Sequence, residues 1–385
     1  MIETASQASN SPEAPLAPKR TRSQEFWRLL KKNRLALAGL AIFLIFFLIA
    51  VAGLALTSGN KPYFDPAMVR LPEKLRPPLS RPNLEVLQPG EVPRLGMYVF
   101  GTDDLGRDVF SRMLQGAWVS LTVGFVAVGI AVFIGIFMGG ISGYYGQTSI
   151  KINHVLLACL LFAGGLSLAF GSIFPGFTLL IVAILFLFRS TRSRKSGKPA
   201  FELTWLQKSA TSVDTVIMRF VDIMLCFPSF FLILTVVALL PASIYNIMIV
   251  IGLTSWMGTT RFVRAEFLSL REQDFVTAAR ALGVNDRRII FRHMIPNAIA
   301  PVLVSATIGI AGAILTEAGL SFLGFGVPPP HATWGNILSD GKRFIFDAPW
   351  LTFIPGFAIL IVVLSFNLFG EGLRDILNPK LRERY

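Results

Sequence analysis

The sequence predicts an all-α protein that crosses a membrane several times. Of its 385 residues, 53% are hydrophobic and only 15% are charged, whereas soluble globular proteins carry about a quarter of their residues as charges. The apolar residues also gather in long blocks, since neither 35–56 nor 118–145 contains a charge. About 20 apolar residues span the hydrocarbon layer as a helix. Because lipid offers no partner to backbone polar groups, such blocks are expected to be helical.

The N-terminal segment, residues 1–34, is predicted to be a cytoplasmic tail. It begins polar and ends in a basic run of seven Lys and Arg between Lys19 and Arg34. The first apolar block, 35–56, is longer than the 7–15-residue apolar core of a secretory signal. We therefore expect this block to stay in the chain as the first span, with the N-terminus in the cytoplasm.

Residues 57–117 are predicted to form an extracytoplasmic loop. Eight prolines lie between Pro62 and Pro93, and prolines exclude a long helix there. The spacing of Val109, Phe110, Met113 and Leu114 predicts a short amphipathic helix at the membrane interface, capped by Thr102 or Asp103. The second span, 118–145, would then return the chain to the cytoplasm.

Residues 146–212 are predicted to hold an inserted helix pair and a basic connector. The stretch 155–188 contains 34 uncharged residues broken by glycines and Pro175. A single helix of that length would measure roughly 50 Å, so two short helices with a turn near Gly171–Gly176 fit better. A re-entrant hairpin is the alternative. The connector, 189–198, is strongly basic.

Residues 213–370 hold four further predicted spans, near 220–240, 244–260, 297–316 and 349–370, and 371–385 form a polar tail. The tail 371–385 is predicted to be cytoplasmic, like the N-terminus. Pro228 is expected to kink the first of the four spans. With eight helices in all, 26 of the 36 Lys and Arg fall on the cytoplasmic side, as the positive-inside rule requires. An odd number of crossings in 155–188 would instead place the basic run 261–292 outside.

The loop 264–296 carries the most specific pattern in the chain. Residues 275–282 predict a short helix with Asp274 as its N-cap, and Gly283 sits where a helix ends. Asn285 or Asp286 can cap a second helix that leads into Pro296. Small residues surrounded by arginines predict a surface that another protein approaches closely, with anionic lipid headgroups as the alternative ligand.

This loop resembles the EAA loop of ABC importer permeases. Thr277-Ala278-Ala279, Gly283 and Pro296 follow the family spacing, although Thr277 stands in place of the family's Glu, His293 in place of Ile and Ile295 in place of Leu. If Asp274 were the cap, that lost Glu would occupy position N3 and complete a capping box.

Other stretches resemble the C-type second permease of dipeptide and oligopeptide importers. They are FGTDDLGRDVFSRMLQGAWVSL (100–121), SGYYG (142–146), VDTVIMRFVDIML (213–225), VRAEFLSLREQDFVTAARALG (263–283), EAGLSFLGFGVPPPHATWGNILSDG (317–341) and EGLRDILNPKLR (371–382). The resemblance fails between Gln147 and Ser212, where family members pass almost directly from one helix to the next.

The resemblance implies a type I ABC importer transmembrane fold, with six core helices plus the inserted pair, in the cytoplasmic (inner) membrane. It implies peptides as the solute, with nickel chelates or another small solute as alternatives. The implied partners are a homologous second permease, two ABC ATPase subunits or domains, an extracytoplasmic solute-binding protein and membrane lipid. The residues expected to couple to the ATPases are Thr277, Ala278, Ala279, Arg280, Gly283, Arg287, Arg288 and Pro296.

Several other classes of protein are disfavoured. No GxxxxGK[ST] phosphate-binding motif occurs, so the chain is not expected to be an enzyme and ATP hydrolysis is expected on partner subunits. Three histidines and two cysteines without ligand spacing predict no metal site, and no cofactor is expected. The net charge of +13 lies in juxtamembrane runs and does not indicate nucleic acid. A stand-alone secondary transporter or channel is the rival of another class, but it predicts inverted repeats and intramembrane ion ligands.

Three further expectations concern single residues. Arg219 and Asp222 have the spacing of an ion pair on one helix. Glu317 is expected at the outer end of its span, within reach of water. Trp334 and Trp350 resemble an interfacial aromatic belt.

Overall fold

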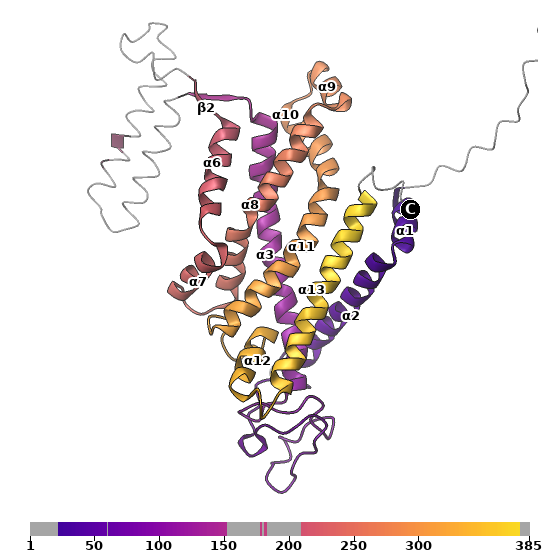
Figure 1. Cartoon of the computed structure of the whole chain (residues 1–385), viewed down its shortest axis with the longest axis vertical. Coiled ribbons are helices and arrows are strands. Elements are labelled where there is room, and N and C mark those ends of the chain that lie inside the picture. The colour runs from indigo at the N-terminus through magenta and orange to yellow at the C-terminus, as the bar shows by residue number, and fades with distance from the viewer. Residues whose placement is uncertain (1–21, 60, 152–177, 179–180, 183–208, 378–385) are drawn as a thin grey trace, which may run out of the picture.

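The computed structural model describes residues 22–59, 61–151, 178, 181–182 and 209–377. Its helices form an elongated bundle with α9 at one end and the loop of residues 58–108 at the other (Figure 1). We call these the α9 end and the loop end. The longer helices are α1 (Arg22–Lys32), α2 (Arg34–Thr57), α3 (Val109–Tyr145), α6 (Val213–Cys226), α7 (Ser229–Leu239), α8 (Ile244–Arg271), α11 (Ile295–Phe322) and α13 (Trp350–Leu377). The shorter elements are η1 (Leu71–Glu73), β1 (Ser149–Lys151), β2 (Ser209–Ser212), α9 (Asp274–Ala281), α10 (Asp286–Arg288), η3 (Ile289–Met294), α12 (Trp334–Gly341) and η4 (Lys342–Phe344).

Two helix pairs frame the bundle. α8 packs along α3, α2 packs against α13, and α11 contacts α3, α8 and α13 and so joins the pairs. Figure 1 places α6 and α7 on the side of the bundle away from α2 and α13. The main core lies where α3, α11, α12 and α13 meet, and it includes Ile314, Leu320, Trp334 and Leu351.

The close approach of α3 and α8 depends on glycines spaced four residues apart on α3. A Cβ added at Gly139 would lie 2.6 Å from the Thr260 carbonyl oxygen, and one at Gly143 would lie 2.5 Å from the Phe267 Cβ. Small residues at this spacing let the backbones of membrane helices pack together. The two helices are therefore held as one unit over the half of the bundle nearest α9.

The chain is a multi-pass membrane protein by the length and composition of its helices. Within the described residues four helices qualify as spans, namely α2, α3, the continuous helix Asp286–Phe322 and α13, and the bent pair α6–α7 would make a fifth. The expected span 244–260 is the first part of α8, which runs on to Arg271. The predicted pair within 155–188 lies outside the described residues apart from Thr178, Ile181 and Val182, so the predicted total of eight stays a prediction.

The expected short helix at 109–114 is not separate. Residues Val109–Tyr145 form one uninterrupted helix of 37 residues. Its N-cap is Asp108, whose carboxylate accepts from the backbone N–H groups of Phe110 and Ser111, and not Thr102 or Asp103. The only helix-breaking residue type between Leu114 and Trp118 is Gly116, and it packs against Trp334. The predicted short helix and the predicted second span therefore join into one helix.

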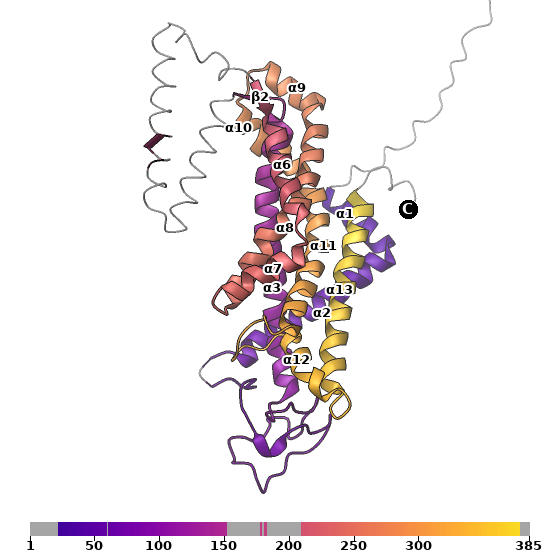
Figure 2. The same ribbon diagram turned by 60° about the vertical axis from the view of Figure 1, so that its left-hand side comes forward.

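Pro228 bends the chain as predicted. α6 and α7 meet at an angle of 79° around Phe227-Pro228, because proline lacks the N–H needed to continue α6 and clashes with its preceding turn. Figure 2 shows α7 turned away from the long axis of the bundle. The predicted span 220–240 is therefore two helices in different directions.

A short antiparallel ribbon joins the two flanks of the inserted segment. β1 pairs with β2 in the register Ser149↔Ser212 and Ile150↔Thr211. Beside it the Val213 N–H donates to the Thr148 carbonyl at 3.1 Å. The Asp214 carboxylate accepts from the Ser142 hydroxyl and is paired with Arg264 of α8. The end of α3 and the start of α6 are thus held side by side.

Candidate coupling surface and the ionic cluster at the loop end

Helix α9 ends in the way its sequence predicts. Gly283 has φ +72°, a left-handed conformation that glycine adopts without steric cost. Its N–H donates to the Arg280 carbonyl at 2.9 Å, and the Val284 N–H donates to the Ala279 carbonyl at 3.1 Å. These two bonds form a Schellman motif. They satisfy the last carbonyls of α9 and turn the chain back toward α10.

The beginning of α9 differs from the prediction. Gln273, not Asp274, is the N-cap, and its side chain makes no capping bond to the described residues. Thr277 is therefore the fourth residue of the helix instead of N3. Its hydroxyl donates to the Asp274 carbonyl at 3.0 Å. A Glu at 277 would not complete a capping box, so the loss of the family's Glu costs no cap here.

The two faces of α9 have different surroundings. Val276 and Ala279 are buried against Phe267, Ile289 and Met294 in a small core at the α9 end. The other face exposes Phe275, Ala278 and Leu282, which share one side of a helix at spacings of three and four residues. Of the two predicted alanines, only Ala278 is therefore available to a partner, while Ala279 packs on its own chain.

A tyrosine at the end of α3 ties the two arms of the loop together. The Arg280 guanidinium lies 4.9 Å from the centroid of the Tyr144 ring, a cation–π contact. The Tyr144 hydroxyl donates to the Asp286 carboxylate at 2.6 Å. α9 and α10 are thus both anchored on α3.

The second arm of the loop is continuous with α11. Asn285 caps α10 by accepting from the Arg287 N–H at 3.1 Å, as predicted. The π-helical segment η3 then runs without a break into α11. Pro296 lies in the first turn of α11, where its missing N–H costs nothing. The second arm of the loop is therefore connected directly to a long helix.

The predicted coupling residues lie on this one structure. Thr277, Ala278, Arg280, Gly283, Arg287, Arg288 and Pro296 are exposed and only Ala279 is buried. Sequence reasoning missed Phe275, Leu282 and Phe291, which are 41%, 84% and 70% exposed. The i, i+3, i+7 spacing of 275, 278 and 282 could have identified the apolar stripe. We call Phe275, Ala278 and Leu282, with Arg280, Arg287 and Arg288 around them, the α9 surface.

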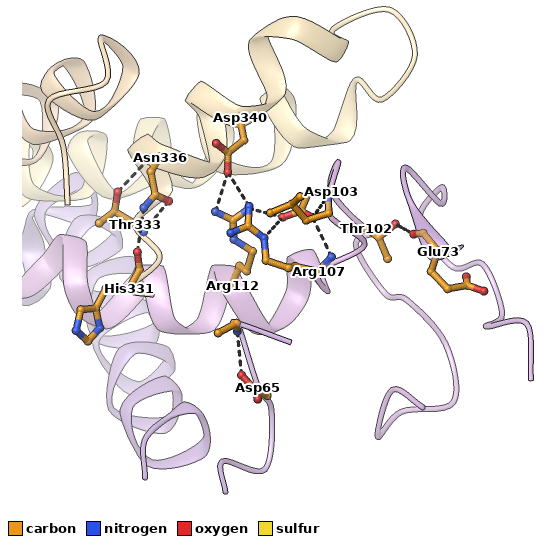
Figure 3. Close-up of polar contacts among 12 residues, drawn as sticks. Asp65, Glu73, Thr102, Asp103, Arg107, Arg112, His331, Thr333, Asn336 and Asp340 are labelled. Atoms are coloured by element: carbon orange, nitrogen blue, oxygen red, sulfur yellow. Dashed lines mark hydrogen bonds and ion pairs between the residues drawn. The ribbon is translucent and has the colours of Figure 1, made fainter. Parts of the chain in front are cut away.

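At the loop end, two arginines and two aspartates form an ionic cluster (Figure 3). Arg112 of α3 pairs with Asp103 at 2.5 Å and with Asp340 of α12 at 2.9 Å. Arg107 pairs with the same two carboxylates at 2.7 and 3.2 Å. Asp103 is fully buried. Burial, with Asp103 and Asp340 nearby, raises the pKa of the neighbouring Asp104 above its usual value. The cluster joins the GTDDLGRD and SDG stretches, which lie over 200 residues apart.

The surrounding contacts correct two predictions about tryptophans. The Trp334 indole is buried and donates to the Met113 carbonyl at 3.2 Å. Trp350 is half-buried and donates to the Thr102 carbonyl at 3.2 Å. Both rings tie the loop end together and neither belongs to an exposed aromatic belt. Among the described residues of this region the most exposed aromatic ring is that of Phe346, at 96%.

Two predictions about acidic residues are also wrong. Asp222 pairs with Arg261 of α8 at 2.6 Å, because α8 runs beside α6 and presents Arg261 there. Glu317 is fully buried instead of reached by water. One of its carboxylate oxygens accepts from the Ser321 hydroxyl at 2.6 Å, and the other has no partner among the described residues. The described residues contain no group of three His, Cys, Asp or Glu placed to hold a metal ion.

Comparison with protein families finds two matches. Residues 205–383 match the family described as binding-protein-dependent transport system inner membrane component. Residues 21–78 match the N-terminal TM domain of oligopeptide transport permease C. Together the two regions include the first span, the α9 surface and α11 to α13.

Similar proteins match over nearly their whole length. The dipeptide transport system permease protein DppC of Alkalihalophilus pseudofirmus is 36% identical over 93% of this chain and 90% of its own. DppC of Haemophilus influenzae is 33% identical, covering 95% and 97%. The oligopeptide transport system permease protein OppC of Bacillus subtilis is 30% identical, covering 92% and 88%. The chain therefore belongs to the permease family of binding-protein-dependent ABC importers, in the branch of the dipeptide and oligopeptide permeases.

Proposed function

We propose that this chain moves peptides across the cytoplasmic membrane by alternating access, driven by two ATPase subunits or domains, one of which docks on the α9 surface. The observation that carries the proposal is the division of α9 into two faces. One face packs on the chain's own core, and the other exposes Phe275 and Leu282 within a rim of arginines. An exposed apolar centre with a polar rim is typical of a protein interface.

The distribution of Lys and Arg supports one orientation of the chain in the membrane. The α9 end carries the basic loop 261–292, and the sequence before the first span is basic as well. Lys and Arg near spans are retained on the cytoplasmic side, which is also where ATP is available. The N- and C-termini and the α9 surface would then be cytoplasmic, and the loop end would meet an extracytoplasmic solute-binding protein.

Coupling would proceed through contacts already described. ATP binding would close the ATPases and shift α9, because its exposed face is docked on one of them. Arg280, Tyr144 and Asp286 connect α9 to α3, and η3 connects it to α11. α3, α8 and α11 would rock as one body against a homologous second permease, which is a common form of switching transition. Anionic lipid headgroups would surround the basic segments.

The test introduces a negative charge in the α9 surface or in the turn beside it without altering the fold of the loop. In Gly283→Asp an added Cβ meets no described atom within 4 Å, so the substitution costs only the left-handed strain of about 1–2 kcal/mol. Leu282→Asp changes a side chain that is 84% exposed. We expect both variants to assemble in the membrane and to lose ATP-driven peptide uptake at least ten-fold.

Gly283→Asn and Leu282→Met are the matched controls. Asn accepts the left-handed conformation about as well as Asp but brings no charge, and Met keeps the apolar contact. Both should retain most of the uptake. If Gly283→Asp and Leu282→Asp transport as the wild type does in complexes that contain the ATPases, the docking site lies elsewhere.

A further inference from the structure

The bend between α6 and α7 leaves a cavity in the side of the bundle. Its volume is about 390 Å³. α6 ends at the bend, α7 turns away from it, and α8 and α11 form the rest of the wall. The lining residues are Leu225, Ser229, Phe230, Ile233, Thr254, Ser255, Met257, Gly258 and Thr316. The cavity has the size of a small-ligand site.

Of the four hydroxyl groups in the lining, those of Thr254, Ser255 and Thr316 donate to carbonyl groups of their own helices, and the fourth is that of Ser229. The Thr254 hydroxyl donates to the Val250 carbonyl at 2.7 Å, Ser255 to Ile251 at 2.7 Å, and Thr316 to Gly312 at 2.8 Å. Each hydroxyl has one proton and two acceptor lone pairs. Because the protons are used on the preceding helical turn, these oxygens meet a ligand as acceptors.

The rest of the lining is uncharged and adaptable. None of the nine residues is acidic, basic or histidine, and Leu225, Phe230, Ile233 and Met257 supply apolar surface. A wall of this kind cannot select a ligand by charge. Met fills irregular gaps and tolerates different shapes. The site therefore favours a ligand that offers N–H donors and carries side chains of any type.

We infer that this cavity is this permease's half of a peptide-binding site in the membrane, with Thr254, Ser255 and Thr316 accepting from peptide N–H groups and Phe230 and Met257 contacting the side chains. The inference rests on the proposed function, since it needs peptides to pass this surface. The open side of the cavity would face the path between the two permeases. Recognition of the backbone alone would let one path carry peptides of different sequence.

Gly258 allows the cavity to be filled without disturbing the bundle. It is exposed on α8, and a Cβ added there meets no described atom within 4 Å. Gly129 on α3 has the same property but does not line the cavity. Gly258→Leu and Gly129→Leu therefore form a matched pair. In reconstituted complexes we expect Gly258→Leu to reduce uptake of a pentapeptide with bulky side chains at least ten-fold and that of dialanine much less.

A second measurement follows the cavity directly. Ser255→Cys, made in a chain with Cys159→Ser and Cys226→Ser, should react with a membrane-impermeant maleimide added from the solute-binding-protein side. The reaction should change with the nucleotide state of the ATPases, and a transported peptide should slow it. Three results would each overturn the inference. The first is an equal uptake profile for Gly258→Leu and Gly129→Leu, and the second is maleimide labelling that the transported peptide does not slow. The third is cross-linking of residue 255 to the second permease in every nucleotide state. In those cases ATP-driven uptake by the parent complex would still support the proposed function, whereas its absence would contradict that function instead.

Discussion

Single residues decide how the loop end is held together. The contribution of Arg112 is the most direct to test. Its guanidinium is almost fully buried and pairs with Asp103 and Asp340. Removing one partner of a buried ion pair leaves an uncompensated charge and costs about 3–5 kcal/mol.

Arg112→Ala should therefore lower the thermal unfolding midpoint of the purified protein by several degrees. Arg112→Lys should recover only part of the loss, because an ammonium cannot reach both carboxylates as a planar guanidinium does. Arg81→Ala, at an exposed arginine of the same loop, is the control and should leave the midpoint unchanged. An Arg112→Ala midpoint equal to that of the control would show that the cluster adds no stability.

At the residue scale, the sequence predicted those roles that depend only on neighbouring positions in the chain. Gly283, Asn285 and Pro228 act on the backbone within a few positions, so their roles could be read from local pattern. Arg112 and Asp340 are 228 positions apart, and no local rule connects them. The same reason explains Asp222, whose partner Arg261 lies 39 positions away and not on its own helix.

At the scale of elements, coupling would depend on how α9 is attached to α3. Tyr144 makes two contacts that can be removed one at a time, since its ring lies beneath Arg280 and its hydroxyl bonds Asp286. Tyr144→Phe keeps the ring and loses one hydrogen bond, a change of about 0.5–1.5 kcal/mol. Tyr144→Ala loses both contacts.

We expect Tyr144→Phe to keep most of the peptide transported per ATP hydrolysed, and Tyr144→Ala to lower that ratio several-fold while the ATPases remain bound. The measurement is uptake and phosphate release in the same vesicles. Equal ratios for the two variants and the wild type would mean that α9 transmits its movement by another route, with η3 and α11 as the remaining connection.

The first and last residues of the helices could not be predicted from composition. Apolar blocks predict where lipid lies, but α3 and α8 continue past their blocks, to 37 and 28 residues. The start of α3 is set by the local cap Asp108, which lies outside the apolar block. Beyond its own block, α8 is held by the pairing of Arg264 with Asp214. The 79° turn at Pro228 likewise needed the structure, because proline predicts a kink without its size.

At the scale of the molecule, the β1–β2 ribbon indicates how the inserted segment can be removed. Ser149 and Ser212 are paired, so residues 150–211 can be replaced by Asn-Gly, which closes a two-residue hairpin turn. Asp214 would keep its contacts with Ser142 and Arg264. We expect the shortened chain to assemble and to take up peptide as the full chain does. A shortened chain that assembles with its partners but does not transport would place the segment within the transport machinery.

The most important prediction for the whole molecule concerns the source of energy for peptide transport. A permease of this family moves its solute only with ATP, whereas the rival secondary transporter would use an ion gradient. Purified complexes of this chain with its second permease and ATPases should be reconstituted into vesicles and supplied with a peptide-loaded binding protein. We predict that peptide accumulation requires ATP hydrolysis and persists after ionophores collapse every ion gradient. Accumulation that proceeds without ATP and stops when the gradients collapse would contradict it.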